Sequence, residues 1–363
     1  MRRSIKFRAG VRLAMGQSNL AWFGAGIALI MIAANLLLPL SARANPYLAK
    51  PGEPVVTVRV ATCAVSGGFV HMYSAIDYGL FDKYGIKVNH IYIRGSGISL
   101  TALASDEIQF LYCAAEATIP GMATGIDGKL IGAPLVGFPY VLLARKDIKR
   151  PEDLKGKSIG VTRPGDLSFR LSRAVLKKFN LTEEEVRIRP IGGSQSERYN
   201  AMLQDIVQAL VITPPLDVRG KKDGFNLIYN LNDLNLPFIY SSLHTNSKML
   251  RERPWLAQRF IAAMAESIYF VEKNPDKAKG SVAKALKLKD PEALQSSYDA
   301  YAKSIINRRM TVPANAVAEA VELAKTETNV RRKASEIFDN TFAEDLEKSG
   351  FLKDLWAGEV PGK

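Results

Sequence analysis

The sequence has few of the residues that most enzymes and metal sites need. Its 363 residues include only two cysteines and three histidines, and His71, His90 and His244 lie at no spacing typical of metal ligands. It lacks a complete Gly-x-x-x-x-Gly-Lys-Ser/Thr phosphate loop and a Gly-x-Ser-x-Gly nucleophile turn, and no acid and base are placed as a catalytic pair. We therefore predict no catalytic residue, no metal site and no cofactor.

The chain also lacks a concentrated run of basic residues, although its formal net charge is +13. Six of the Lys and Arg residues and no acid lie in residues 1–44, so the rest of the chain carries +7. The remaining basic residues are interspersed with acids, as in 273–289. Nucleic-acid binding needs a basic stripe with interleaved aromatic residues, so we predict no nucleic-acid partner.

The two cysteines, Cys63 and Cys113, each lie at the end of a predicted strand. In an oxidising compartment they can form one bridge. Neighbouring parallel strands are poorly suited to a bridge, however, so we expect two small buried thiols.

The N-terminal 44 residues have the pattern of a secretory signal peptide. A basic start precedes the apolar run 20–40, and Ala42-Arg43-Ala44 follows it. This pattern predicts cleavage after Ala44 and a periplasmic mature protein. The alternative is an uncleaved N-terminal anchor, because the apolar run is about as long as a membrane-spanning helix.

Strand-like and helix-like segments alternate through the first half of the chain, which favours parallel sheets covered by helices. A strand, a Gly/Ser turn and a helix recur in the same order in two successive blocks, so two similar α/β lobes are expected. We place the first lobe at 55–145 plus 239–345 and the second at 146–238. The strand 140–145 is assigned to the first lobe, and the strand 238–243 returns to it. Beyond that strand the chain is almost all helix, with an apolar stripe at Leu256, Phe260, Met264 and Ile268.

Small residues follow most of the predicted strands, as in Ser66-Gly67-Gly68, Gly95-Ser96-Gly97 and Gly192-Gly193-Ser194. Ligands of open parallel sheets bind beyond the carboxyl ends of the strands. There, small residues let the backbone approach a ligand, and helix N-termini offer free N–H donors. Each turn alone can be a plain corner, but their distribution over both lobes predicts one shared ligand cleft.

Four segments carry a family resemblance that extends over nearly the whole chain after residue 44. They are "AIDYGLFDKYGIKV" (75–88), "ALASDEIQFLYCAAEATIPGMATG" (102–125), "RPEDLKGKSIGV" (150–161) and "RYNAMLQDIVQALVITPP" (198–215). In their order and spacing the chain resembles the periplasmic solute-binding proteins of ABC importers, of the nitrate/sulfonate/taurine type and similar to thiamine-pyrimidine-precursor-binding proteins. The resemblance implies a type II periplasmic-binding-protein fold, with two α/β lobes, two crossover segments and a ligand cleft between the lobes.

Residue by residue, the resemblance also implies a ligand-binding set. Phe69, Phe138, Tyr140 and Leu167 can surround an aromatic or apolar body, whereas an ionised Glu116 would repel an anion. The implied ligand-binding residues are Ser66, Gly67, Phe69, Ser96, Gly97, Ala114, Glu116 and Tyr140 from the first part of the chain, and Gly165, Leu167, Ser168, Ser194, Thr213 and Pro214 from the second.

The resemblance implies a binding protein and not an enzyme. We expect a monomer that captures a small organic or anionic solute (sulfonate-, nitrate-, pyrimidine- or aromatic-acid-like) and delivers it to an ABC permease in the inner membrane. One alternative is a thiamine-pyrimidine synthase-like enzyme on the same fold. The other is a membrane-tethered ligand sensor, if residues 1–44 are not removed.

Overall fold

Two mixed five-stranded sheets organise the chain. The computed structural model describes residues 45–164, 166–234, 237–326 and 328–358. The predicted signal peptide, 1–44, and Gly165 of the predicted site lie outside the described residues. The first sheet has the order β2 (Ile86–Tyr92), β1 (Val56–Thr62), β3 (Phe110–Cys113), β10 (Ile239–Thr245), β4 (Lys129–Val136). The second has the order β7 (Arg187–Pro190), β6 (Ser158–Val161), β8 (Ala209–Ile212), β5 (Val141–Ala144), β9 (Asn226–Asn230).

The last strand of the first sheet comes from far along the chain. β1 is parallel to β2 and β3, whereas β10 lies antiparallel between β3 and β4. Every residue of β10 is buried, as expected for a central strand covered on both faces. This pairing confirms the predicted return of 238–243 to the first sheet.

One predicted strand belongs to the other sheet. The sequence assigned 140–145 to the first lobe, but β5 pairs antiparallel with β8 and β9 of the second sheet. That assignment was wrong because the apolar run Val141–Ala144 can fill a buried position in either sheet, and only its pairing partners decide. The chain therefore crosses from the first sheet to the second between β4 and β5, and it returns before β10.

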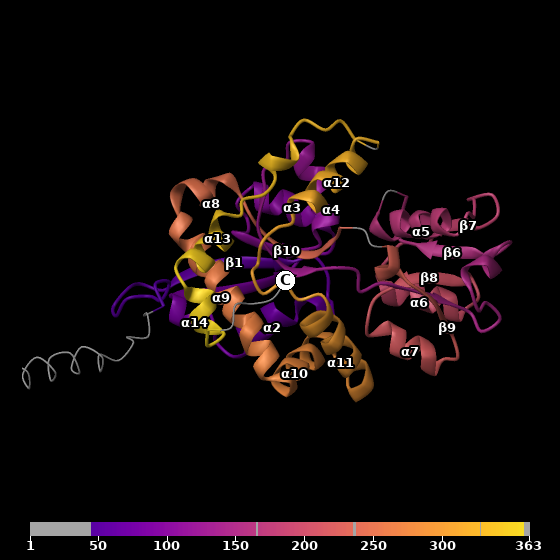
Figure 1. Cartoon of the computed structure of the whole chain (residues 1–363), viewed down its shortest axis with the longest axis horizontal. Helices are drawn as coiled ribbons and strands as arrows, with labels where there is room; N and C mark the ends of the chain where they lie inside the picture. The colour runs from indigo at the N-terminus through magenta and orange to yellow at the C-terminus, as the bar shows by residue number, and fades with distance from the viewer. Residues whose placement is uncertain (1–44, 165, 235–236, 327, 359–363) are drawn as a thin grey trace, which may run out of the picture. The chain divides into compact units, whose positions relative to one another are not determined.

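Helices cover both sheets. Figure 1 shows β6 to β9 grouped with α5, α6 and α7. The helical elements before β5 are η1 (Gly67–Phe69), α2 (Val70–Asp77), η2 (Asp82–Tyr84), α3 (Ser96–Ala104) and α4 (Ala115–Ala123). Those between β5 and β10 are η3 (Pro151–Leu154), α5 (Leu167–Lys178), α6 (Gln195–Leu203), α7 (Leu216–Lys222) and η4 (Leu231–Leu234).

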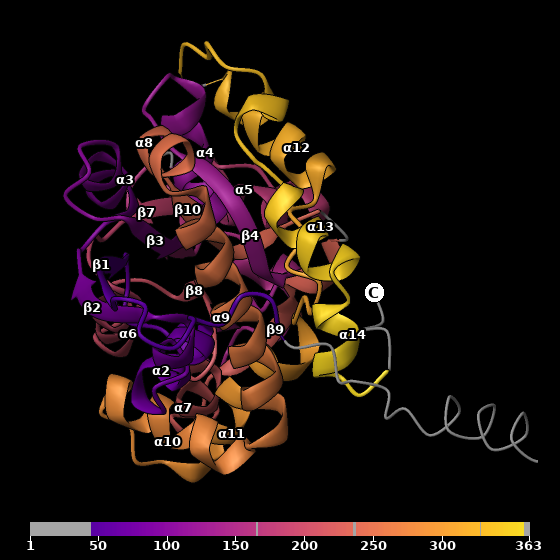
Figure 2. The same ribbon diagram turned by 90° about the vertical axis from the view of Figure 1, so that its left-hand side faces the viewer.

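The chain after β10 is helical and packs on the first sheet, as predicted. Leu256, Phe260, Met264 and Ile268 of α9 are all completely buried, and the ring of Phe260 stacks on Phe110 of β3 with centroids 3.9 Å apart. In Figure 2 the yellow helix α13 lies beside β4. The helical elements here are α8 (Ser247–Glu252), α9 (Pro254–Lys273), α10 (Pro275–Leu286), α11 (Pro291–Tyr298), the π-helical turn η5 (Asp299–Ser304), α12 (Ala314–Ala324), η6 (Ala334–Glu336), α13 (Thr341–Lys348) and α14 (Phe351–Leu355).

One hydrophobic cluster continues from the first sheet into the second. It joins Leu135 of β4 and Tyr301 of η5 to Leu142 of β5 and Leu171 of α5, and it passes through the aromatic residues of the crossover segments. The aromatic side chains at the crossovers are therefore buried in apolar surroundings, and this is where residues of both sheets meet.

Candidate functional site

Aromatic side chains gather where the two crossover segments run side by side. Phe138 and Tyr140 come from the first crossover, Phe238 lies at the end of the second, and Tyr240 is the second residue of β10. The rings of Phe138 and Phe238 stack with centroids 4.1 Å apart, and those of Tyr140 and Tyr240 lie 5.8 Å apart. All four side chains are buried. The predicted site residue Tyr140 therefore lies in an aromatic cluster between the sheets.

A chain of hydroxyl groups links the first glycine turn to the second sheet. The Ser66 Oγ lies 3.2 Å from the Tyr240 hydroxyl, which donates to the Tyr301 hydroxyl at 3.2 Å. Tyr301 in turn donates to the carbonyl oxygen of Pro214 at 3.0 Å. Burial raises the pKa of Tyr240 and Tyr301, so both phenols stay protonated and can donate. The predicted residues Ser66 and Pro214 are thus connected through two tyrosines.

The first glycine turn needs glycine because side chains pack against its backbone. A Cβ atom on Gly68 would overlap the ring of Tyr240, and one on Gly67 would overlap the Ser297 hydroxyl. The neighbouring Phe69 is buried, and its ring centroid lies 5.0 Å from that of Tyr112. Close approach of Tyr240 and Ser297 is therefore the reason for glycine here. The predicted approach of a ligand to this turn stays a prediction.

The carboxyl end of β8 is tied to the N-terminus of α6. Gln195 accepts a hydrogen bond from the Thr213 backbone N–H at 2.9 Å, and its amide donates to the Thr213 hydroxyl at 3.0 Å. Ser194 caps α6 and exchanges hydrogen bonds with Glu197, as in a capping box. Ser194 is exposed and Thr213 is buried, so these two predicted residues lie at different depths.

Arg198 is a buried cation of α6 that the sequence analysis did not select. Its side chain donates from Nη1 to the Thr162 hydroxyl at 2.7 Å and to the Gly193 carbonyl oxygen at 3.0 Å. Thr162 is also held by Ser168 of α5, whose Oγ accepts from the Thr162 backbone N–H at 2.9 Å. Burial lowers the pKa of Arg198, although an arginine remains charged at any physiological pH. Among the residues that the structure describes, no carboxylate lies within ion-pair distance of Arg198.

Glu116 is a buried acid in the first turn of α4. Its side chain is 8% exposed, and its Oε1 atom has no hydrogen-bond partner among the described residues. Burial raises the pKa of Glu116 to about 7, even though the nearby charge of Arg170 acts in the opposite direction. Arg170 of α5 donates from Nη2 to the Glu116 carbonyl oxygen at 2.9 Å, which joins α4 to α5.

A disulfide joins the ends of β1 and β3. The Cα atoms of Cys63 and Cys113 are 5.4 Å apart, because both residues directly follow the paired residues Thr62 and Tyr112. The expected free thiols are therefore wrong: neighbouring parallel strands in register bring their end residues within bridging distance. The hydroxyl of Ser96, at the start of α3, lies 3.4 Å from the Sγ of Cys113.

The remaining predicted residues are less closely associated. Gly97 of α3 has no heavy atom of another segment near the position of a Cβ, and Leu167 is half-buried in the first turn of α5. Ala114 precedes α4, and its extended backbone forms the N-cap of that helix. The structure thus connects Ser66, Tyr140, Thr213 and Pro214 most closely, and the ligand-binding role of the whole set stays a prediction.

His71 lies in the first turn of α2. Its side chain is completely buried, and neither ring nitrogen has a hydrogen-bond partner among the described residues. Burial lowers the pKa of His71 to about 3, so its imidazole is neutral. In the described part of the chain, no group of three or more His, Cys, Asp and Glu side chains is placed to hold a metal ion.

The residues that sequence reasoning missed are Tyr240, Tyr301, Gln195, Arg198 and Thr162. Tyr240 and Tyr301 resembled ordinary core residues of a strand and a helix. Arg198 had a usable signal, because it lies one helical turn after Gly192-Gly193-Ser194. A search for charged residues one turn into each helix that follows a glycine turn would have found it.

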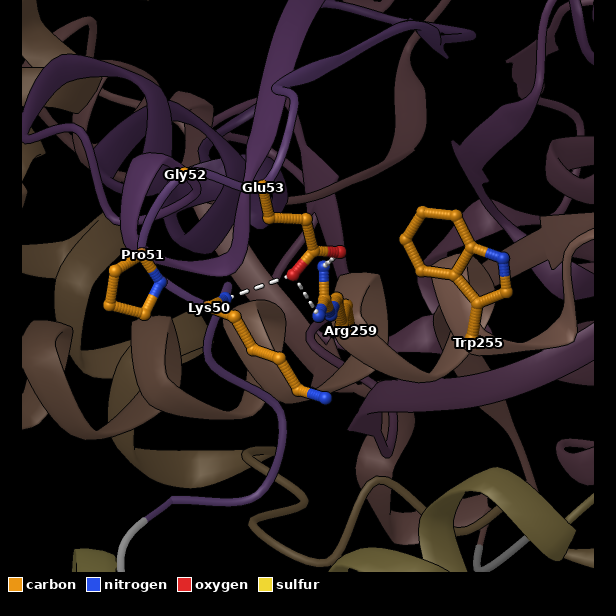
Figure 3. Close-up of a pocket in the computed structure, with 6 residues that line it drawn as sticks. All are labelled: Lys50, Pro51, Gly52, Glu53, Trp255 and Arg259. Atoms are coloured by element: carbon orange, nitrogen blue, oxygen red, sulfur yellow. Dashed lines mark hydrogen bonds and ion pairs between the residues drawn. The ribbon is translucent and has the colours of Figure 1, made fainter.

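Two surface hollows lie away from the predicted residues. The larger, about 440 Å³, is lined by residues that pair with one another: Arg259 binds Glu53 at 2.6 Å and lies over the ring of Trp255 (Figure 3). The smaller, about 320 Å³, lies between β1, β2, α2 and α10, and the ion pair of Lys284 and Asp77 lies at it. Neither hollow is lined by a residue of the predicted site.

A family model described as NMT1/THI5 like matches residues 67–278, more than half of the chain. The chain belongs to the NMT1/THI5-like family. This confirms the resemblance found in the sequence. No helix among the described residues is both long and apolar enough to cross a membrane.

This NMT1/THI5-like chain is similar to several binding proteins. It is 27% identical over 239 residues to "Putative binding protein BAB2_1146" of Brucella abortus (strain 2308). That alignment covers 64% of this chain and 72% of the relative. It is 22% identical over 263 residues to the riboflavin-binding protein RibY of Chloroflexus aurantiacus, and the alignment covers 69% of this chain and 74% of RibY. The structure is similar to the alkanesulfonate-binding protein SsuA from Xanthomonas axonopodis pv. citri bound to MOPS, with a TM-score of 0.65, 16% identity, and coverage of 80% of this chain and 99% of SsuA. The predicted periplasmic-binding-protein fold is thereby confirmed.

Proposed function

We propose that this protein is the extracytoplasmic solute-binding component of an ABC importer. The observation that carries the proposal is the match of the NMT1/THI5-like family model to residues 67–278. The fold supports it, because its two sheets meet at the crossovers. There, Tyr240 and Tyr301 connect the turn at Ser66 to Pro214 of the other sheet. Binding in such a fold needs no chemical step, since a solute that contacts both lobes favours the closed state.

The relatives of this chain support a small-molecule solute. RibY is named for riboflavin and SsuA for alkanesulfonates, so the family fold accommodates both an aromatic body and an anionic group. The buried tyrosines and Glu116 of this chain offer aromatic faces and hydrogen-bonding groups of the same general kind. The solute would then be handed to a permease in the inner membrane.

Direct binding and closure test the proposal. The chain that begins at Asn45 is purified and titrated by calorimetry with sulfonates, nitrate, riboflavin, pyrimidines and aromatic acids. We expect micromolar or tighter binding of at least one solute, accompanied by a smaller radius of gyration in X-ray scattering. A folded protein that binds none of them, or that converts a bound compound to product, would contradict the proposal.

The cellular location is tested separately. Mass spectrometry of the protein from a periplasmic extract should find Asn45 at its N-terminus, as the signal-peptide pattern predicts. An intact N-terminus in the membrane fraction would favour the tethered sensor instead.

A further inference from the structure

Arg198 has half of its guanidinium group without a partner. Nη1 is fully used by the Thr162 hydroxyl and the Gly193 carbonyl oxygen. Nε and Nη2 form no hydrogen bond to any residue that the structure describes. Neither of them is among the fully buried atoms that lack a partner, so both remain accessible to solvent. The free Nε–Nη2 edge is the side of the guanidinium that binds a carboxylate or sulfonate through two parallel hydrogen bonds.

The charge of Arg198 is not neutralised by the acids around it. The side chain is 6% exposed, and a buried cation is costly unless it is paired. Asp166 and Glu197 are the acids whose charges act on Arg198. Asp166 is paired with Arg163 at 3.3 Å, and Glu197 with Arg94 at 3.1 Å. Neither of these acids lies within ion-pair distance of Arg198, so the buried charge lacks a counter-ion.

The surroundings of Arg198 favour an anion and an aromatic body. Thr162 and Gly193 fix the guanidinium beside the first turns of α5 and α6, where the helix termini carry partial positive charge. The charge of Arg198 also acts on the Tyr140 hydroxyl, so this tyrosine lies within electrostatic range of it. Tyr140 itself belongs to the aromatic cluster between the sheets.

We infer that Arg198 binds the anionic group of the solute, a carboxylate or a sulfonate, through its free Nε–Nη2 edge. The inference rests on the proposed function, because it names the solute class of that same site. The bound anion supplies the counter-ion that the buried guanidinium lacks, and the body of the solute extends toward Tyr140. A neutral solute of the same shape leaves the cation unpaired and binds more weakly.

Matched acid and amide probes test the inference. Benzoate and benzamide, and benzenesulfonate and benzenesulfonamide, are titrated into the wild-type chain and into Arg198→Gln, Arg198→Lys and Arg173→Gln. Arg173 is the control, because it is an exposed arginine of α5 whose ion pair is with Glu183, an acid that does not act on Arg198. Circular dichroism and melting curves establish that each variant is folded.

We expect at least one acid to bind the wild type at least tenfold more tightly than its amide does. Arg198→Gln should weaken acid binding at least tenfold, Arg198→Lys should restore part of it, and Arg173→Gln should leave it unchanged. If Arg198→Gln does not fold, Arg198→Lys decides, because it keeps the charge and loses the two-pronged edge.

The outcomes separate this inference from the proposed function. If the folded wild type binds benzamide as tightly as benzoate, or prefers riboflavin to every acid, the anion site is wrong and the binding protein stands. If folded Arg198→Gln binds the acids as tightly as the wild type does, the anion site is likewise wrong and the binding protein stands. If the folded wild type binds neither these probes nor any solute of the wider panel, the proposed function itself fails, and the inference fails with it.

Discussion

At the scale of single residues, burial sets the protonation of two ionisable side chains, Glu116 and His71. Burial raises the pKa of Glu116 to about 7, and it lowers that of His71 to about 3. Both shifts favour the neutral form, because a charge is poorly solvated inside the protein. The two residues therefore affect stability in opposite pH ranges.

Glu116 makes the folded protein less stable as the pH rises. Its pKa is higher in the folded protein than its ordinary value of 4.5, so the stabilisation is complete below pH 4.5 and is lost as the pH rises through about 7. At about 1.4 kcal/mol per pH unit, the loss is about 3 kcal/mol at most. Urea unfolding of the wild type and Glu116→Gln at pH 5 and pH 8 measures it.

We expect Glu116→Gln to gain stability relative to the wild type between pH 5 and pH 8. Glu107→Gln, which changes an exposed acid, serves as the control and should follow the wild type. An equal pH response in the wild type and Glu116→Gln would show that Glu116 is ionised in the folded protein over this whole range.

His71 makes the folded protein less stable in acid. Its pKa is lowered on folding, so its contribution is complete above pH 6.5 and is lost as the pH falls toward 3. Replacing His71 by Leu removes two buried nitrogens that have no described partner. We expect the urea midpoint of His71→Leu to fall less steeply than that of the wild type between pH 7 and pH 4.

Part of the acid sensitivity should persist in His71→Leu. His244 is also buried, with a pKa lowered to about 4, and it is held by Thr118 at 2.8 Å and by the Leu111 carbonyl oxygen at 3.1 Å. A variant as acid-sensitive as the wild type would mean that His71 reaches solvent and is protonated without unfolding.

At the scale of elements, the disulfide fixes the ends of β1 and β3, where predicted ligand-binding turns begin. Cys63 precedes Ser66, and Cys113 precedes Ala114 and lies against Ser96. The same bond therefore restrains three segments at once. These segments come from different parts of the chain and meet at the carboxyl ends of β1 and β3.

Removal of the disulfide should destabilise the protein and loosen these turns. The bond spans a separation of 50 residues, and closing a loop of that size stabilises a protein by about 4 kcal/mol in the chain-entropy model. We expect Cys63→Ala/Cys113→Ala to have a lower urea midpoint than the wild type and a lower affinity for any solute that the wild type binds. Dithiothreitol should lower the urea midpoint of the wild type and leave that of the double variant unchanged.

Alkylation of the unfolded, unreduced protein followed by mass spectrometry checks the bond itself. Neither cysteine should be labelled before reduction. Labelling of both without reductant would contradict the bridge.

At the scale of the whole molecule, a few polar contacts link the two sheet regions. Tyr301 binds the Pro214 carbonyl oxygen at 3.0 Å, and Lys222 of α7 binds Asp290 and Glu292 at the start of α11 at 2.6 and 3.0 Å. The lysine pairs are exposed and so contribute little. The buried tyrosine hydrogen bond should contribute more.

Tyr301→Phe should therefore shift the ligand-free protein toward an open state. It removes a buried hydrogen bond of roughly 1 kcal/mol, which changes an open–closed equilibrium several-fold. X-ray scattering should show a larger radius of gyration for Tyr301→Phe than for Lys222→Ala. Lys348→Ala is the control, because it removes an exposed ion pair within a single helix. If all three variants scatter as the wild type does, Tyr301 does not hold the lobes together.

Much of the architecture could be predicted because its signals are local. The α9 stripe from Leu256 to Ile268 and the small residues after β1 can be identified from short windows of sequence. The return of β10 to the first sheet could also be anticipated, since an apolar strand precedes the helical half. The sequence by itself thus determined the α/β class, the family and the turns at the strand ends.

Only the tertiary structure decided which distant segments meet. The run Val141–Ala144 suits either sheet, and the bridge between Cys63 and Cys113 depends on the register of β1 and β3. Likewise, the Nη1 hydrogen bonds of Arg198 use a threonine from another strand end, and the Tyr240–Tyr301 link joins residues 61 positions apart. Pairing, burial and missing counter-ions arise from contacts between segments, and no local pattern of residues encodes them.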